Sequence, residues 1–309
     1  GFHGSANNNG ISLSLDAMSH PRICAWDTAH SQLLYLTNSS QGWEQQGLAS
    51  QSSVDNSAPM VLDDTGNRSI FAYANDPRYN GSTGPDPTLT SIHESDVGSY
   101  TRTVDTSLDL YYVYPSLARN ANGTVHMAYW AGPEIEWGTT DGGIELRYAA
   151  WDGMAWNERT LQEFTDHSPL FFVQSSNAVD SSGNPHILYS TYDVMTGDHS
   201  FVYGYWDGVE WRTTPIEDSS YDNPALVLDS MDRPHMVYVG GGNPRSTLHY
   251  VYWDGDTWIK EDVDTYLGLP SMAGTSLRLD ANDLPQIAYV DAYDEVEGVL
   301  GREVKWAHK

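Results

Sequence analysis

The longer segments between the apolar runs of this chain combine carboxylates with aromatic and basic side chains. A carboxylate accepts hydrogen bonds from hydroxyl groups and an aromatic ring stacks on a C–H face, so together these residue types suit a sugar. We therefore take these segments as the candidate binding region. Its candidate residues are Asp27, His30, Arg78, Tyr79, Glu136, Trp137, Tyr192, Asp193, His199, Arg245 and Tyr293.

The same kinds of residue could also perform catalysis. A histidine, a tyrosine and an arginine can act as base, acid and charge neutraliser in a β-elimination on a uronate, and the candidates are His167, Tyr112 and Arg245. Two carboxylates could instead hydrolyse a glycosidic bond. Neither arrangement has a fixed sequence spacing, and the sequence holds no serine-hydrolase elbow, Walker loop, HExxH or CxxC motif. Binding and catalysis therefore both stay open.

A repeat must position these residues. Three segments are nearly alike: WDGMAW at 151–156, WDGVEW at 206–211 and WDGDTW at 253–258. A second signature accompanies them, DSSGNPHI at 180–187 and DSMDRPHM at 229–236. The first position of this second signature recurs about every fifty residues, at Asp16, Asp63, Asn120, Asp180, Asp229 and Asp280. A period of this length is typical of propeller blades built from four strands.

One unit shows the expected strands. Short apolar runs occupy 224–228, 235–239, 247–253 and 258–263, with turn residues between them, and Asp254-Gly255 is a strong hairpin signal. We name these four strands A to D. The sequence therefore predicts an all-β, six-bladed β-propeller of four-stranded antiparallel blades, a single domain over 1–309. The expected blades are approximately 11–50, 51–106, 107–163, 164–217, 218–266 and 267–309, the last completed by 1–10 because it lacks a strand D.

The connections differ between the two ends of the expected blades. The A–B and C–D turns are short and repeated, whereas the B–C and D–A connections vary from unit to unit. Variable loops on a rigid scaffold are where binding sites usually lie, so we expect the site on the B–C and D–A face. The equivalent histidines His126, His186 and His235 lie well apart in such a fold, which favours structural roles.

Composition excludes some partners. The 42 acidic and 15 basic residues give a net charge of −27, which repels nucleic acid and anionic membranes. No apolar stretch is long enough to span a membrane, and the start at Gly1 fits a processed protein. We expect an extracellular or cell-surface protein. The charge suits a saline environment, where screening reduces self-repulsion, as well as an ordinary acidic secreted protein.

The carboxylates of the candidate binding region could also hold Ca²⁺, although no EF-hand spacing is present. Nothing indicates the oligomeric state.

The repeat unit resembles those of a known group of proteins. Read as strand, Asp-x-x-Gly-x-Pro-His-Ile, strand, Trp-Asp-Gly-x-x-Trp, it is similar to repeats of bacterial and archaeal secreted β-propellers of the broad sialidase-like kind. That group includes glycan-binding lectins, glycosidases and polysaccharide lyases, so the resemblance implies a carbohydrate ligand. The chain lacks a Ser-x-Asp-x-Gly-x-x-Trp box and an assignable arginine trio, although Arg22 in Pro21-Arg22-Ile23 is similar to a sialidase arginine. No catalytic residue is carried over.

Three hypotheses follow. The first is a secreted, lectin-like propeller that binds a glycan or polysaccharide on its B–C and D–A face, as the acidic and aromatic loops indicate. The second is a polysaccharide-active enzyme, a lyase or glycoside hydrolase with one site in the central funnel, which the unequal loops favour. The third is a structural or protein-interaction module of a cell surface.

Overall fold

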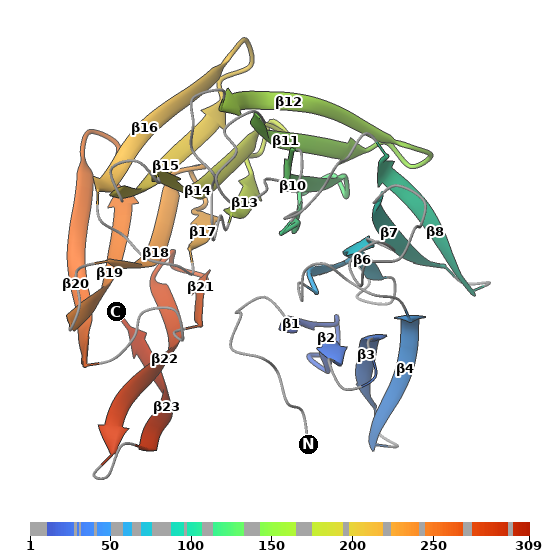
Figure 1. Cartoon of the computed structure of the whole chain (residues 1–309), viewed down its shortest axis with the longest axis horizontal. Helices are drawn as coiled ribbons and strands as arrows, with labels where there is room; N and C mark the ends of the chain where they lie inside the picture. Colours follow the sequence, from blue (N-terminus) through green and yellow to red (C-terminus); the bar gives the residue numbers. More distant parts are fainter. Residues whose placement is uncertain are drawn as a thin grey trace. The chain divides into compact units, whose positions relative to one another are not determined.

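The chain forms two compact units, Gly1–Asp166 and His167–Lys309, and every described element in them is a β-strand (Figure 1). The computed structural model describes residues 11–27, 30, 32–39, 42–50, 58–63, 69–75, 88–95, 98–106, 114–132, 143–164, 175–193, 198–218, 224–240, 245–267, 274–295 and 299–309. Among these residues no helix is long and apolar enough to cross a membrane.

The first unit contains three four-stranded antiparallel sheets, which we number 1 to 3 along the chain. Sheet 1 consists of β1 (Ile11–Leu15), β2 (Pro21–Asp27), β3 (Gln32–Ser39) and β4 (Gly42–Ser50). Sheet 2 consists of β5 (Met60–Leu62), β6 (Ser69–Asn75), β7 (Thr88–Ser95) and β8 (Gly98–Asp105). Sheet 3 consists of β9 (Ser116–Arg119), β10 (Val125–Ala131), β11 (Ile144–Trp151) and β12 (Trp156–Phe164).

The second unit contains sheets 4 to 6. Sheet 4 consists of β13 (Ser175–Val179), β14 (Pro185–Asp193), β15 (Asp198–Trp206) and β16 (Trp211–Asp218). Sheet 5 consists of β17 (Ala225–Leu228), β18 (Pro234–Gly240), β19 (Arg245–Trp253) and β20 (Trp258–Leu267). Sheet 6 has three described strands, β21 (Thr275–Leu279), β22 (Pro285–Glu295) and β23 (Val299–His308).

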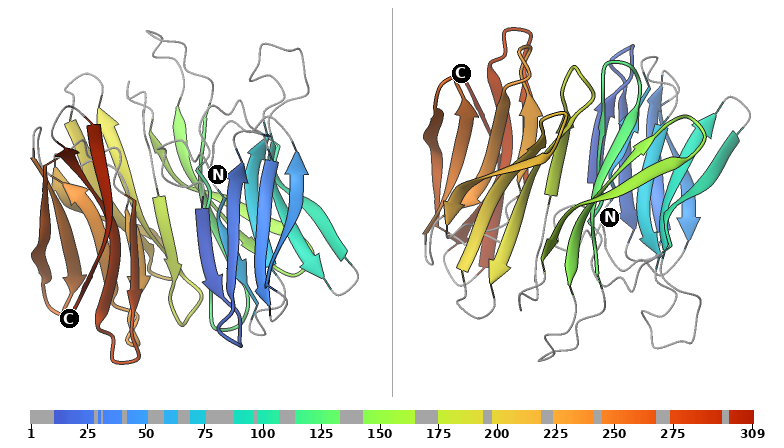
Figure 2. Two further views of the ribbon diagram at one scale, coloured as in Figure 1. Left: turned by 90° about the horizontal axis from the view of Figure 1, so that it is seen from below. Right: turned by 90° about the horizontal axis from the view of Figure 1, so that it is seen from above.

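The sheets confirm the predicted fold class. Each is a meander in which sequential strands pair antiparallel, in the order A, B, C and D in sheets 1 to 5 and A, B and C in the described part of sheet 6, and such meanders are the blades of a six-bladed β-propeller. In side views the strands of each unit run side by side, with the connections at their ends (Figure 2). The expected completion of the last blade by residues 1–10 lies outside the described residues and stays a prediction, as does the single domain over 1–309.

The repeated turns form because one aspartate, or Asn120 in the A–B turn of sheet 3, accepts hydrogen bonds from the backbone N–H groups of the turn. In the A–B turn of sheet 5, Oδ1 of Asp229 accepts hydrogen bonds from the backbone N–H groups of Met231 and Arg233 at 2.9 and 2.8 Å. In the C–D turn, Oδ1 of Asp254 accepts from Asp256 and Thr257 in the same way, both at 2.8 Å. The following Gly255 has a φ of 111°, which a side chain would strain. The residues of the repeated signatures therefore stabilise the turns between strands.

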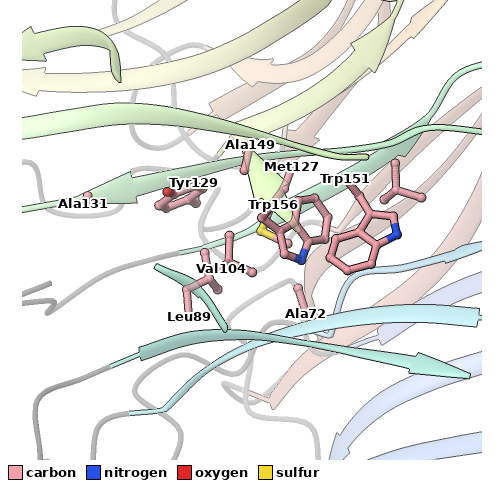
Figure 3. Packing of buried hydrophobic residues seen from close by; sticks show 10 residues of the cluster. Ala72, Leu89, Val104, Met127, Tyr129, Ala131, Ala149, Trp151 and Trp156 are labelled. Carbon is pink, nitrogen blue, oxygen red and sulfur yellow. The ribbon is translucent and has the colours of Figure 1, made fainter. Parts of the chain in front are cut away.

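The hydrophobic cores lie between successive sheets of each unit. Val104 of sheet 2 packs in one buried cluster with Met127 and the pair Trp151 and Trp156 of sheet 3 (Figure 3). The indole Nε1 of Trp156 also donates to Oγ of Ser91 in sheet 2, at 2.8 Å. The repeated tryptophans thus bury apolar area between blades, which is the main favourable term in such packing.

A β-bulge recurs in the C–D pair of all five four-stranded sheets. The register of strand D shifts by one residue there, and the residue left without a partner is apolar each time: Leu48, Val104, Leu161, Ile216 and Val263. A bulge re-aims the side chains that follow it. The residue directly after the bulge is acidic in sheets 2, 4 and 5, namely Asp105, Glu217 and Asp264.

Candidate functional site

The candidate residues of sheet 1 lie at its B–C end, as the meander requires. Asp27 is the last residue of β2, and His30 follows in the connection to β3. Nδ1 of His30 is 2.7 Å from Oδ2 of Asp27, and the imidazole is exposed while the carboxylate is half-buried. This pair presents an acceptor and a titratable ring to solvent at the predicted face.

Three candidates lie at the B–C end of sheet 4. Tyr192 and Asp193 close β14, and the register pairs Tyr192 with His199 in β15. Burial lowers the pKa of His199, so its imidazole is neutral at pH 7. Two further candidates lie at the same end of their own sheets: Arg245 opens β19 in register with Leu267, and Tyr293 of β22 pairs with Gly301.

The remaining candidates stay predictions. The substrate-binding candidates Arg78, Tyr79, Glu136 and Trp137 and the catalytic candidates Tyr112 and His167 lie outside the described residues.

The structure adds polar clusters between sheets that the sequence did not indicate. Between sheets 4 and 5, the hydroxyl of Tyr238 in β18 donates to Oε2 of Glu217 in β16 at 2.5 Å, and Nζ of Lys260 in β20 donates to the same oxygen at 2.7 Å. His249 in β19 lies alongside, with Nδ1 2.8 Å from Oδ1 of Asp262. Burial lowers the pKa of His249, so the ring is neutral and donates from Nδ1 to that carboxylate.

A glycine makes room for this histidine. A Cβ atom on Gly240 would lie 2.9 Å from Cδ2 of His249, so a larger residue would displace the ring. Asp262 and Lys260 lie at the mouth of the cluster, with 71% and 41% of their side chains exposed. The cluster therefore offers hydroxyl, carboxylate, ammonium and imidazole groups in fixed positions. The Tyr238 hydroxyl and the His249 imidazole belong to buried residues, whereas the Lys260 ammonium and the Asp262 carboxylate reach solvent.

A second cluster of this kind joins sheets 2 and 3. The hydroxyl oxygen of Tyr129 in β10 lies 2.9 Å from Oδ2 of Asp105 and 3.1 Å from Oε2 of Glu158. The guanidinium of Arg147 in β11 donates to Asp105 at 2.5 Å and to Glu145 at 2.7 Å. The side chain of Asp105 is 1% exposed, whereas Glu158 is an exposed residue whose carboxyl group alone is partly buried, against the hydroxyl of Tyr129.

The two glutamates of this second cluster differ in acidity. The hydrogen bond from Arg147 lowers the pKa of Glu145. Burial, and then the negative charge of Asp105, raise the pKa of Glu158. The same few strands therefore hold one carboxyl group that ionises readily and one that retains its proton to higher pH.

A third cluster joins sheets 5 and 6. The hydroxyl of Tyr289 in β22 donates to Oδ2 of Asp264 at 2.8 Å, and Nζ of Lys305 in β23 donates to the same oxygen at 3.1 Å. Burial raises the pKa of Asp264, but these hydrogen bonds outweigh that effect and hold the pKa below its usual value.

The three clusters share one construction. The acid follows the bulge of a strand D, and the tyrosine comes from strand B of the next sheet. Both positions are near the B–C and D–A end of the strands. The tyrosines could have been found from the sequence, because they recur at one position of the repeat, three residues after its histidine position. They are Tyr129, Tyr189, Tyr238 and Tyr289.

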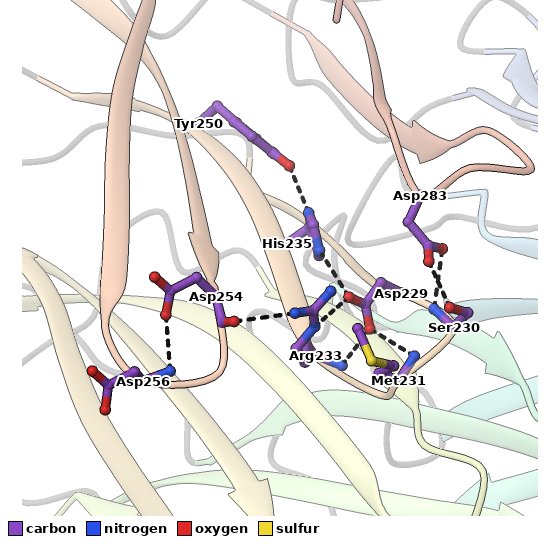
Figure 4. Close-up of polar contacts among 9 residues, drawn as sticks. All are labelled: Asp229, Ser230, Met231, Arg233, His235, Tyr250, Asp254, Asp256 and Asp283. Atoms are coloured by element: carbon purple, nitrogen blue, oxygen red, sulfur yellow. Dashed lines mark hydrogen bonds and ion pairs between the residues drawn. The ribbon is translucent and has the colours of Figure 1, made fainter.

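The opposite end of the strands uses its polar groups for packing. In sheet 5, Oδ2 of Asp229 is 3.5 Å from Nε2 of His235, whose Nδ1 contacts the hydroxyl of Tyr250 at 2.5 Å (Figure 4). Asp180, His186 and Tyr203 repeat the arrangement in sheet 4. Burial lowers the pKa of both histidines. These contacts join strands B and C to the A–B turn, which is a structural role.

The described residues include no group of three or more His, Cys, Asp or Glu side chains that could hold a metal ion. The three clusters place their carboxylates against hydroxyl groups and cations.

Comparison with known proteins supports the fold. The chain is similar to the polysaccharide lyase Uly1 (TM-score 0.54, 9% identity, covering 97% of this chain and 77% of that one). It is similar to the SapL1 lectin in complex with alpha methyl fucoside (TM-score 0.56, 13% identity, 96% of each chain). It is also similar to the intramolecular trans-sialidase from Ruminococcus gnavus in complex with oseltamivir carboxylate (TM-score 0.56, 10% identity, 100% and 96%). Neither a protein-family model nor a curated protein matches the sequence. The chain therefore has the fold of sialidase-like, lectin and polysaccharide lyase propellers.

Proposed function

We propose that this protein is an extracellular or cell-surface glycan-binding β-propeller whose B–C and D–A ends contact the saccharide. The observation that carries the proposal is the cluster of Tyr238, Glu217, His249, Lys260 and Asp262, which is open to solvent at Lys260 and Asp262. Carboxylates accept from sugar hydroxyls and an ammonium donates to them, so fixed groups of both kinds suit a polyhydroxylated ligand.

The recurrence of the cluster favours binding over catalysis. Tyrosine, acid and cation recur between sheets 2 and 3 and between sheets 5 and 6. A binding protein gains avidity from several similar sites on one scaffold, whereas an enzyme needs one. Likeness to a lectin in complex with a fucoside agrees with this interpretation.

The test is native electrophoresis in gels that contain single soluble polysaccharides. We expect one or more polymers to retard the protein and to stay intact. Tyr192→Ala and Trp137→Ala should weaken the retardation while far-UV circular dichroism stays unchanged. Unchanged retardation in both variants would count against the B–C face, and retardation by no polymer would count against glycan binding.

A polysaccharide lyase or hydrolase is the second candidate. One observation favours it: Glu145, which Arg147 contacts, and Glu158, which Tyr129 contacts, belong to one cluster, and their pKa values shift in opposite directions. Carboxyl groups whose acidities are pushed apart can divide the roles of acid and base. Cleared polymer in the same gels would support this function, and Glu158→Gln should then abolish the clearing. Intact polymer throughout would contradict it.

A further inference from the structure

The cations of the three inter-sheet clusters are already paired with carboxylates. Arg147 contacts Asp105 and Glu145 at 2.5 and 2.7 Å. Lys260 contacts Glu217 at 2.7 Å, and Lys305 contacts Asp264 at 3.1 Å. An anionic ligand group could bind one of these cations only by competing with a carboxylate that is fixed in place.

Among the described residues, the carboxylates equal or outnumber the cations in each cluster. In the cluster between sheets 2 and 3, the guanidinium of Arg147 donates to Asp105 and Glu145, and the carboxyl group of Glu158 contacts the Tyr129 hydroxyl beside Asp105. In the cluster between sheets 4 and 5, Glu217 and Asp262 face one ammonium and a buried imidazole. The pair between sheets 5 and 6 is balanced, with Asp264 against Lys305. These clusters therefore carry zero or negative charge, within a chain whose net charge is −27.

A hydroxyl group of a ligand does not have to compete with a fixed carboxylate for its partner. It donates to a free lone pair of Asp262 or Glu217 and accepts from an N–H of Lys260, and the existing pair stays intact. A carboxylate or sulfate would instead lie beside like charges that it cannot neutralise, which is how a site rejects the wrong ligand. Discrimination by charge is thus built into the same groups that would bind hydroxyls.

We infer that the ligand is a neutral, hydroxyl-rich saccharide without carboxylate, sulfate or phosphate groups at the contacted units. This inference rests on the proposed glycan binding. It narrows the ligand class by excluding uronates and sialic acids from these clusters.

The test compares matched polymers that differ only in charge. Each neutral polysaccharide of a panel is used beside its carboxymethylated and sulfated forms in affinity gels at low and high salt. We expect retardation by a neutral polymer that hardly changes with salt, and at least about tenfold weaker retardation by its charged forms. Stronger retardation by a charged form, lost at high salt, would overturn the inference while leaving glycan binding in place. Retardation by none of the polymers would overturn the proposed function itself.

Two variants separate the local cluster from the overall charge. Asp262→Lys places a cation at the mouth of the cluster, and Asp256→Lys makes the same change in the C–D turn at the other end of β20. Both residues are exposed, so both variants should fold. We expect Asp262→Lys alone to gain retardation by the charged polymers. An equal gain in both variants would show that net charge, and not the cluster, excludes anions, and would overturn the inference.

Discussion

The hydroxyl of Tyr238 donates to Oε2 of Glu217 at 2.5 Å and so joins β18 of sheet 5 to β16 of sheet 4. Glu217 is in reach because Ile216 bulges out of the β15–β16 register directly before it. The same relationship links Tyr289 to Asp264 and Tyr129 to Asp105. One backbone irregularity, repeated along the chain, therefore places an acid against the next blade and builds both the contact between blades and the candidate binding clusters.

Removal of the Tyr238 hydroxyl should weaken the contact between sheets 4 and 5. Tyr238→Phe keeps the buried ring and loses the bond to Glu217, which should cost roughly 1–2 kcal/mol in the free energy of unfolding. Tyr252→Phe is the matched control, because no hydrogen bond joins that hydroxyl to another described residue. Urea unfolding of both variants measures the difference, and equal stability would contradict a role for the Tyr238 bond.

Asp232 links two A–B turns at the expense of backbone strain. Its carboxylate accepts from the backbone N–H and the hydroxyl of Ser181 at 2.9 and 2.5 Å, while its φ is 61°. The equivalent position in sheet 4 is Gly183, with a φ of 86°. Asp232→Ala keeps the strain and loses both bonds, and Asp232→Gly loses the bonds but relieves the strain.

We therefore expect Asp232→Ala to unfold at lower temperature than Asp232→Gly, by an amount equivalent to about 1 kcal/mol. Thermal scans of the two variants beside the parent test this order. If the glycine variant were the less stable, the positive φ of Asp232 would not be a source of strain.

Glu158 should make stability fall as pH rises. Burial and then the Asp105 carboxylate raise its pKa in the folded protein. Between its ordinary value and this raised value the folded state binds more protons than the unfolded state, so increasing pH disfavours folding. Glu158→Gln cannot ionise. The melting temperature of the variant should therefore rise relative to the parent as pH increases through this window, and a constant difference from pH 4 to pH 8 would contradict the shift.

Gly204 is required by the tryptophan of its own hairpin. A Cβ atom at this position would lie 2.2 Å from Cζ2 of Trp211. Gly204→Ala should displace the indole and destabilise the protein by about 1–3 kcal/mol, with a changed near-ultraviolet spectrum. Gly143→Ala is the control, since its Cβ would meet only the carbonyl oxygen of Phe164, at 3.6 Å. Equal effects of the two changes would contradict this packing.

The sequence predicts the fold well because the fold repeats. Asp229 and Asp254 satisfy their own turns through neighbouring N–H groups, so the turn signals are local and can be read from adjacent residues. The strands between them alternate in the expected way, and the predicted meander of strands A to D follows in sheets 1 to 5. The last repeat holds three apolar runs, and the described part of sheet 6 has three strands.

The candidate site was less accessible to sequence reasoning. Tyr238 and Glu217 are 21 residues apart and lie in different sheets. Their contact depends on a register shift that the residue types in the sequence do not predict. The sequence did predict that Asp27 lies near His30 and Tyr192 near His199, because each pair lies within one hairpin. Contacts within a repeat were therefore predictable, and contacts between repeats were not.

The central claim is that the B–C and D–A end binds the glycan, and a pair of alanine variants tests it most directly. Asp262→Ala removes an exposed acceptor from the cluster between sheets 4 and 5, and Asp256→Ala removes an exposed carboxylate from the opposite end of the same hairpin. The measurement is the dissociation constant of each variant for the polysaccharide that retards the parent protein. We expect about tenfold weaker binding for Asp262→Ala, because a hydrogen bond to a charged group is lost, and no change for Asp256→Ala. Unchanged binding by Asp262→Ala together with loss in Asp256→Ala would place the ligand on the turns of the Trp-Asp-Gly segments and contradict it.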